Sequence, residues 1–228
     1  MPTVTTVLHG YSLTSNQGNP AFCSVLLVES AGERILFDVG HAGRRRHLIS
    51  ALTERGLGAA DVDKVVLSHG HWDHLQNVDL FPAAQVFVHG AELRNLADPP
   101  ASDLGTPRWA RSVLDGLDVR EVKEGDEVVA GVTVLELPGH TPGSIGLAVD
   151  TADGTAVLAA DAVPTLAVLR ACRASGRPYD RERADASIER VASLADVVHP
   201  GHDRPIRLDA DGEFDYTGAA MPLEFRVP

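Results

Sequence analysis

Short apolar runs alternate with polar turns along most of the chain, and they predict more strands than helices. The runs Ala21 to Glu29 and Arg34 to Asp38 flank the turn residues Ala31-Gly32-Glu33, which predicts a β-hairpin. A second hairpin is predicted from Ser144 to Val149 and Thr155 to Ala159, again around a glycine-containing turn. The remaining predicted strands are Val65–Leu67, Ala84–His89, Val119–Glu121, Glu127–Val129, Val132–Leu137 and Val197–Val198.

Apolar residues recur at helical spacing in two longer segments, Arg44–Arg55 and Arg183–Leu194. Glu92–Leu96 predicts a helical turn, and the Pro-, Gly- and Ser-rich residues 98–110 predict a loop rather than a domain linker. The three strands between residues 119 and 137 are expected to be joined by tight turns. Strands in hairpins mixed with helices indicate a mixed fold class (α/β or α+β), with sheets sandwiched between helices.

The composition is that of an ordinary globular protein. The 228 residues are 44% hydrophobic and 23% charged, which predicts a single domain over residues 1–228. The net charge of −12 would repel polyanions, so neither nucleic acid nor an anionic membrane is an expected partner. The longest apolar run is far shorter than the roughly 20 residues of a membrane helix.

The two cysteines and the start of the chain predict a cytoplasmic location. Cys23 and Cys172 lie far apart and form no CxxC motif, so no disulfide framework is expected. The first 17 residues lack a basic segment followed by an apolar one, which is the pattern of a secretion signal.

One histidine-rich segment carries the candidate chemistry. Residues 69–74 read His-Gly-His-Trp-Asp-His and directly follow the predicted strand Val65–Leu67. Imidazole and carboxylate groups are the usual ligands of zinc, manganese and iron in proteins. Similar ligand-type residues follow other apolar runs where a strand meets a loop, which is where the sites of α/β scaffolds gather. These further candidates are His140, Asp161, His199 and His202.

These motifs resemble those of the metallo-β-lactamase superfamily of dinuclear metallohydrolases. The H-x-H-x-D-H signature of that family matches residues 69–74, and its later elements match Pro138–Gly143, Asp161 and the Gly201-His202-Asp203 turn. The resemblance runs from about Leu26 to Asp203. It implies an αββα sandwich with two sheets inside, helices outside and the metals at the sheet edge.

The resemblance also implies two divalent metal ions, most simply Zn²⁺, with Mn²⁺ or Fe²⁺ as alternatives. His202 is preferred over His199 as the last ligand because, as in the family, it follows a glycine. Asp38 matches the D-x-G turn of the family and is expected to orient a metal-binding histidine. The implied ligands are His69, His71 and His140 for one metal, Asp73, His74 and His202 for the other, and Asp161 bridging both.

Two cations that share a water molecule make hydroxide available near neutral pH and polarise a carbonyl oxygen. The predicted function is therefore a dinuclear metal-dependent hydrolase, whose bridging hydroxide attacks the carbonyl of a small neutral ester or lactone. Asp161, which would orient the hydroxide, and Asp73 are the expected catalytic residues. The alternatives are a thioesterase, a compact phosphodiesterase or endonuclease of the same fold, and more remotely a non-catalytic metal-stabilised binding protein. The expected partner is a small-molecule substrate, and a homodimer is an open alternative.

Within the superfamily, the chain is most similar to the N-acyl homoserine lactonase-like and glyoxalase II-like group. Those lactonases have a tyrosine three residues past the bridging aspartate, where this chain has Pro164, so Tyr179 is the candidate replacement. Glutathione is not an expected substrate group, because only three arginines (204, 207 and 226) follow His202.

Apolar residues that could line a substrate pocket or belong to the core are Trp72, Trp109, Leu114, Leu117, Leu166, Val168 and Leu169.

Overall fold

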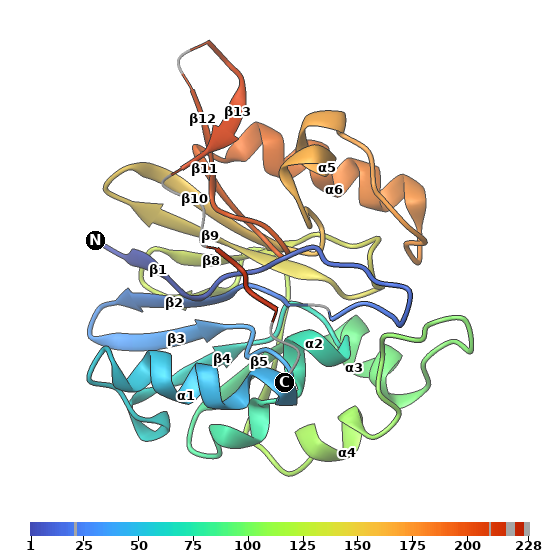
Figure 1. Ribbon diagram of the computed structural model, residues 1–228. Helices are drawn as coiled ribbons and strands as arrows, with labels where there is room; N and C mark the ends of the chain where they lie inside the picture. The colour runs from blue at the N-terminus through green and yellow to red at the C-terminus, as the bar shows by residue number, and fades with distance from the viewer. Residues whose placement is uncertain (21, 210, 218–221, 226–228) are drawn as a thin grey trace.

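The computed structural model describes residues 1–20, 22–209, 211–217 and 222–225. Ala21, where the first predicted hairpin was expected to begin, and Arg226 lie outside these residues. Two β-sheets pack face to face, and helices cover the outer face of each, so the chain forms four layers (Figure 1). This is the αββα sandwich expected from the sequence.

The first sheet combines an antiparallel hairpin with parallel strands. Ser30 pairs with Glu33, and Ala31 and Gly32 between them have φ angles of 52° and 85°, as a tight two-residue hairpin turn requires. The strand order is β1 (Thr3–Leu8), β2 (Val25–Ser30), β3 (Glu33–Phe37), β4 (Lys64–Val66), β5 (Gln85–His89) and β6 (Val119–Val122). The helices of this half are α1 (Arg45–Thr53), α2 (Trp72–Leu75), α3 (Gly90–Ala97) and α4 (Ala110–Leu114), with 3₁₀ turns at Ala42–Arg44, Ala59–Asp61 and Val78–Leu80.

The second sheet is antiparallel except where β10 and β11 run parallel, joined by two helices. Those helices are α5 (Leu166–Ala171) and α6 (Arg181–Leu194). The strand order is β13 (Phe214–Tyr216), β12 (Ile206–Leu208), β11 (Val197–Pro200), β10 (Gly154–Ala160), β9 (Ile145–Thr151), β8 (Val132–Glu136) and β7 (Glu127–Val129). Within the described residues, every helix falls short of the length and apolar character that a membrane span needs.

Three apolar layers hold the sandwich together. Phe37, Phe87 and Leu147 are buried between the two sheets, because alternate residues of each strand point inward. The outer faces pack against the helices. The residues Leu114, Leu166, Val168 and Leu169, which the sequence left open as pocket or core, are all buried in these helix-facing layers. They stabilise the fold and are not pocket walls.

Both predicted hairpins and both predicted long helices are confirmed, but one connection differs from the expectation. β6 runs parallel beside β5 in the first sheet, whereas β7 pairs with β8 in the second. The tight turn after β6 therefore joins the two sheets instead of two neighbouring strands. This crossing buries Val122 and Val128 in the layer between the sheets. Elements without a sequence prediction are β1, α2, α4, α5, β12 and β13.

The fold gathers several strand ends at one edge. The carboxyl ends of β3 and β4 in the first sheet lie near those of β8, β10 and β11 in the second, as hydrogen bonds between the halves show. Ile145 N–H donates to Ser68 O at 2.9 Å, and Ser24 N–H donates to Gly201 O at 2.6 Å. Loops that are far apart in the sequence therefore meet where the candidate ligands lie.

Candidate metal centre

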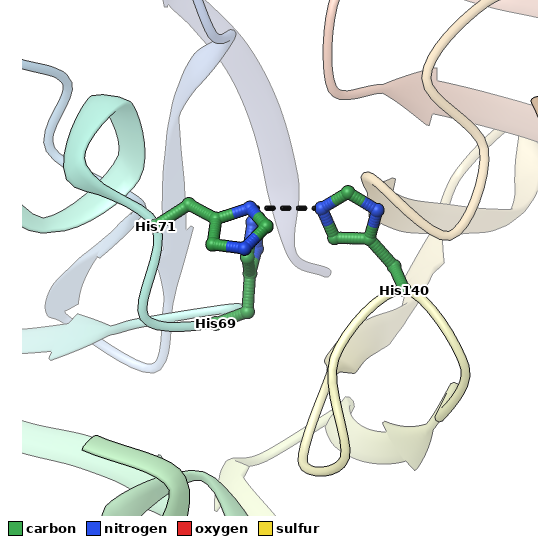
Figure 2. A group of neighbouring side chains, drawn as sticks. All are labelled: His69, His71 and His140. Atoms are coloured by element: carbon green, nitrogen blue, oxygen red, sulfur yellow. Dashed lines mark hydrogen bonds between the residues drawn. The ribbon is translucent and has the colours of Figure 1, made fainter. Parts of the chain in front are cut away.

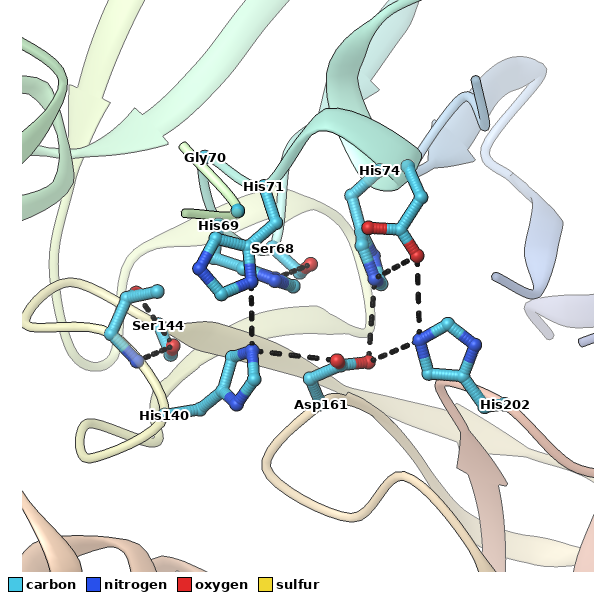
Figure 3. A network of polar contacts seen from close by, with 12 residues as sticks. Ser68, His69, Gly70, His71, His74, His140, Ser144, Asp161 and His202 are labelled. Atoms are coloured by element: carbon cyan, nitrogen blue, oxygen red, sulfur yellow. Dashed lines mark hydrogen bonds and ion pairs between the residues drawn. The ribbon is translucent and has the colours of Figure 1, made fainter. Parts of the chain in front are cut away.

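The structure brings all seven predicted ligands into one cluster at this edge (Figure 3). The segment 69–74 follows β4 and continues into α2, and His140, Asp161 and His202 follow β8, β10 and β11. In each of three overlapping groups, the candidate ligand atoms lie within 4.8 Å of one another. The groups are His69, His71 and His140; His69, His74 and Asp161; and Asp73, His74 and His202.

The first group consists of three imidazoles that face one another (Figure 2). His140 Nε2 lies 3.0 Å from His71 Nδ1. The His69 ring centroid is 4.6 Å from that of His71 and 4.8 Å from that of His140. Burial lowers the pKa of His140 to about 4, so its imidazole is neutral at pH 7, as a metal ligand must be.

The second group combines a carboxylate with two imidazoles. Asp73 Oδ2 lies 3.5 Å from His74 Nε2 and 3.5 Å from His202 Nε2. Burial acts to lower the pKa of His74, but the carboxylates around it, including those of Asp73 and Asp161, raise it well above its usual value. The surplus of negative charge at this point is what a bound cation would neutralise.

Asp161 lies between the two groups. Its Oδ1 is 3.3 Å from His74 Nε2 and 3.2 Å from His202 Nε2, and its Oδ2 is 3.4 Å from His140 Nε2. Burial acts to raise the pKa of Asp161, but His202 and His74 hold it well below its usual range, so the side chain is a carboxylate. Gly201 is needed beside it, because a Cβ atom there would overlap Asp161 Oδ1.

The cluster fits divalent metal ions. Three buried polar atoms that face its centre make no hydrogen bond to any described residue: Nε2 of His69, Nε2 of His74 and Oδ1 of Asp161. Leaving such atoms without partners costs about 1–3 kcal/mol each, unless something else binds them. Imidazole nitrogens and carboxylate oxygens at this spacing are a donor set suited to zinc, manganese or iron.

In most of these histidines, the ring nitrogen that faces away from the cluster contacts an oxygen of another residue. This contact fixes the orientation of the ring. Asp38, predicted to orient a metal-binding histidine, lies with Oδ2 2.7 Å from His74 Nδ1. It also accepts hydrogen bonds from the Ser68 backbone N–H and hydroxyl. The further contacts are His69 Nδ1 to Ser68 Oγ at 2.9 Å, and His202 Nδ1 to Phe22 O at 3.1 Å.

Asp103 was not identified from the sequence, although it lies beside His71 as Asp38 lies beside His74. Its Oδ1 lies 3.3 Å from His71 Nε2. Partial burial acts to raise the pKa of Asp103, but hydrogen bonds from His71, Thr106 and the Gly105 amide hold it well below its usual range. The residue lies in the segment 98–110, where the Pro- and Gly-rich composition predicts only a loop, and no spacing rule connects it with the histidines.

Glu92 was also missed, and it joins two of the ligand loops. Its fully buried carboxylate accepts hydrogen bonds from Gly70 N–H at 2.8 Å, the Thr141 hydroxyl at 2.7 Å and Gly143 N–H at 3.0 Å. Gly70 lies between His69 and His71, and Thr141 follows His140, so Glu92 fixes these loops relative to each other. A Cβ atom at Gly143 would overlap the Glu92 backbone, which explains the glycine.

His199, the alternative to His202, lies outside the cluster. It shares a strand face with Val197 on β11 and lines a separate cavity of about 450 Å³ with Val4 and Ala156. Its side chain is 8% exposed, and Nδ1 has no hydrogen-bond partner among the described residues. The geometry therefore favours His202.

The burial of His199 predicts a pH-dependent stability. Burial lowers its pKa to about 4 from the unfolded value of 6.5, so the unfolded chain binds the extra proton and stability falls as the pH drops from 6.5 towards 4. The free energy of unfolding of the parent should fall between pH 7 and pH 5. In His199→Leu this fall should be smaller by about 2 kcal/mol. Urea unfolding at both pH values measures this, with the exposed His47→Leu as control. An identical pH dependence in parent and His199→Leu would contradict it.

A cavity of about 470 Å³ opens beside the first group of histidines. His71 and His140 form part of its wall, and Tyr179 lies at the same cavity, with its backbone N–H donating to His140 O at 3.2 Å. Pro164 lines a smaller cavity of about 200 Å³ with His140 and Asp161. Trp72 is not among the described residues that line either cavity, and its ring centroid lies 5.0 Å from that of His41.

Comparison with known proteins identifies the class of this protein. The model of the metallo-β-lactamase superfamily matches residues 18–202. Metallo-beta-lactamase domain-containing protein 1 of Mus musculus is 31% identical over 214 residues, which are 90% of this chain and 75% of that protein. The Xenopus laevis protein of the same name is 32% identical over 186 residues, covering 78% of this chain and 70% of its own.

The fold is shared with a solved N-acyl homoserine lactone hydrolase that has N-hexanoyl-L-homoserine bound at its metal centre. The TM-score is 0.70 at 21% identity, and the match covers 89% of this chain and 92% of that structure. The chain therefore belongs to the metallo-β-lactamase superfamily. It is a metallohydrolase of that superfamily.

Proposed function

We propose that the chain holds two divalent metal ions and hydrolyses the carbonyl group of small esters or lactones. The observation that carries the proposal is the position of Asp161. One of its oxygens faces His74 and His202 and the other faces His140, each at 3.2–3.4 Å. A carboxylate with an oxygen directed at each group is the arrangement that two neighbouring cations need.

The metals would be held by the residues of the two groups, with Zn²⁺ the simplest occupant and Mn²⁺ or Fe²⁺ the alternatives. When bound, such a pair lowers the pKa of a shared water molecule and polarises the carbonyl oxygen of the substrate. The ionised Asp161 would orient this water, and Asp73 would contribute its carboxylate on the His202 side. Asp38, Ser68 and Asp103 hold the imidazole rings in the tautomers that direct the free nitrogens inward.

The cavity beside His71 and His140 supports a small substrate. Its volume of about 470 Å³ is in the usual range for small-molecule sites. Tyr179 lines it and is the candidate donor of a proton to the leaving oxygen, in place of the tyrosine that Pro164 replaces. The lactone hydrolase of similar fold supports the choice of a lactone as the first substrate to test.

The experiment is proton release after mixing the zinc-loaded protein with N-hexanoyl-L-homoserine lactone, with metal content measured on the same sample. We expect acid release that requires bound metal, and two metal ions per chain. A protein with two metals that opens neither this lactone nor simple aryl esters would contradict the carbonyl hydrolase proposal, and thioesters and phosphodiesters would then be tested. A content of one metal per chain after full loading would contradict the dinuclear proposal.

A further inference from the structure

An unpaired arginine lies at the cavity beside the candidate metal centre. Arg177 belongs to the loop between α5 and α6, and it is the one lysine or arginine among the described residues that line this cavity. Its side chain is exposed, and it also lines the smaller cavity of His140 and Asp161, so both cavities beside the cluster share this arginine. Among the described residues it has no ion pair or hydrogen bond.

A second donor without a partner lies in the wall of the same cavity. Asn95, on α3, is 8% exposed, and its Nδ2 makes no hydrogen bond to any described residue. A buried amide without a partner costs about 1–3 kcal/mol, so a ligand that accepts a hydrogen bond there would recover this cost. The lining thus offers at least two donors that the protein itself does not use.

Asp103 is the one acidic residue among the described residues that line this cavity, and its carboxylate is already hydrogen-bonded. The Asp103 carboxylate accepts hydrogen bonds from Gly105 and Thr106 and faces His71, and among the described residues no ion pair joins it to Arg177. An arginine without a counter-ion beside the site is notable in a chain of net charge −12. A charged donor and a neutral donor together suit a carboxylate group, which accepts from both.

We propose that Arg177 and Asn95 form a subsite for a carboxylate group carried by the substrate. This inference rests on the proposed function, and it narrows the substrate class from esters and lactones in general to those that carry a second, anionic end. The neutral ester predicted from the sequence should then have a lower kcat/KM than an ester that carries a carboxylate. The Arg177 guanidinium attracts the anion to the mouth of the cavity, and the buried Asn95 amide fixes its position.

The test compares two esters of equal chain length, mono-4-nitrophenyl glutarate and 4-nitrophenyl pentanoate. The parent should have the higher kcat/KM for the anionic ester. In Arg177→Gln the ratio of the two kcat/KM values should fall about ten-fold, chiefly through KM, and Arg177→Lys should restore part of it. Asn95→Leu should lower the same ratio several-fold. Arg173→Gln, a change of an exposed arginine in the same loop, should leave the ratio as in the parent.

A binding measurement separates this proposal from the proposed function. Glutaramate, an amide that replaces the ester, should bind the zinc-loaded parent about ten-fold more tightly than it binds Arg177→Gln, as measured by calorimetry, and pentanamide should not distinguish them. Binding of this kind without hydrolysis of any ester would support the subsite and contradict the carbonyl hydrolase. Hydrolysis with the same substrate ratio and the same affinity in parent and Arg177→Gln would overturn the subsite. Unfolding temperatures of the variants show that they are folded.

Discussion

Replacing Asp161 by Asn is expected to lower kcat/KM for the ester and lactone substrates by about 10³-fold and to reduce the bound metal below two ions per chain. The carboxylate oxygens of Asp161 face His74, His202 and His140 at 3.2–3.4 Å, and an amide has neither the charge nor a second acceptor oxygen. The substitution keeps the size of the side chain, so the packing against Gly201 is preserved. Metal content by mass spectrometry and steady-state kinetics measure the two effects.

The matched control is Asp153→Asn. Asp153 lies in the exposed turn before β10, at the strand end opposite to Asp161, and it belongs to none of the candidate metal groups. This variant should keep the metal content and kinetics of the parent. If Asp161→Asn retained two metals and parental kcat/KM, Asp161 could not be the shared ligand.

Asp38→Asn is expected to have the second-largest effect, a loss of metal affinity of about 10- to 100-fold with a matching loss of activity. Asp38 Oδ2 accepts from the Ser68 hydroxyl at 2.7 Å and lies 2.7 Å from His74 Nδ1, which keeps the proton of this imidazole on Nδ1. An amide NH₂ in that place would donate to Nδ1 and move the proton to Nε2. The His74 atom that faces Asp161 would then be unable to bind a metal.

The fold should tolerate this change. Asp38 has a φ of 58°, and Asn is one of the few non-glycine residues that adopt such a conformation readily. Zinc titration against a competing chelator measures the affinity, and thermal unfolding of the metal-free protein checks the fold. Asp63→Asn is the control, because Asp63 also accepts a backbone hydrogen bond, from Arg34 N–H at 2.8 Å, but among the described residues it forms no ion pair or hydrogen bond with a histidine. Equal zinc affinity in the parent and Asp38→Asn would show that the contact does not orient a ligand.

Several features of this protein could be predicted from the sequence because they depend on neighbours in the chain. The β2–β3 hairpin follows from two apolar runs around a glycine turn, and the structure pairs Ser30 with Glu33 as expected. The segment 69–74 holds four ligand-type side chains that lie close together in any conformation the chain adopts. The order of the later ligand motifs then predicted the superfamily and its sandwich.

Other features depend on contacts between distant segments, and the sequence could not predict them. The sheet to which β6 belongs was decided by the burial of Val122 and Val128 between the sheets, which no local pattern shows. Asp103 lies 32 residues from His71 along the chain, and Glu92 contacts Thr141 across 49 residues. Such partners become neighbours only after the two halves pack.

The sequence by itself therefore determined the class of the protein and most of the candidate ligands, because these lie in short motifs at strand ends. The resemblance preferred His202 over His199, but only the tertiary structure shows that His202 lies in the cluster and His199 outside it. His199 lies within β11 on the same face as Val197, away from the cluster, and His202 lies beyond the strand end, 3.2 Å from Asp161. Strand alternation fixes the direction of a side chain within β11, but only the packing of the two sheets places the loop beyond it against the other ligands.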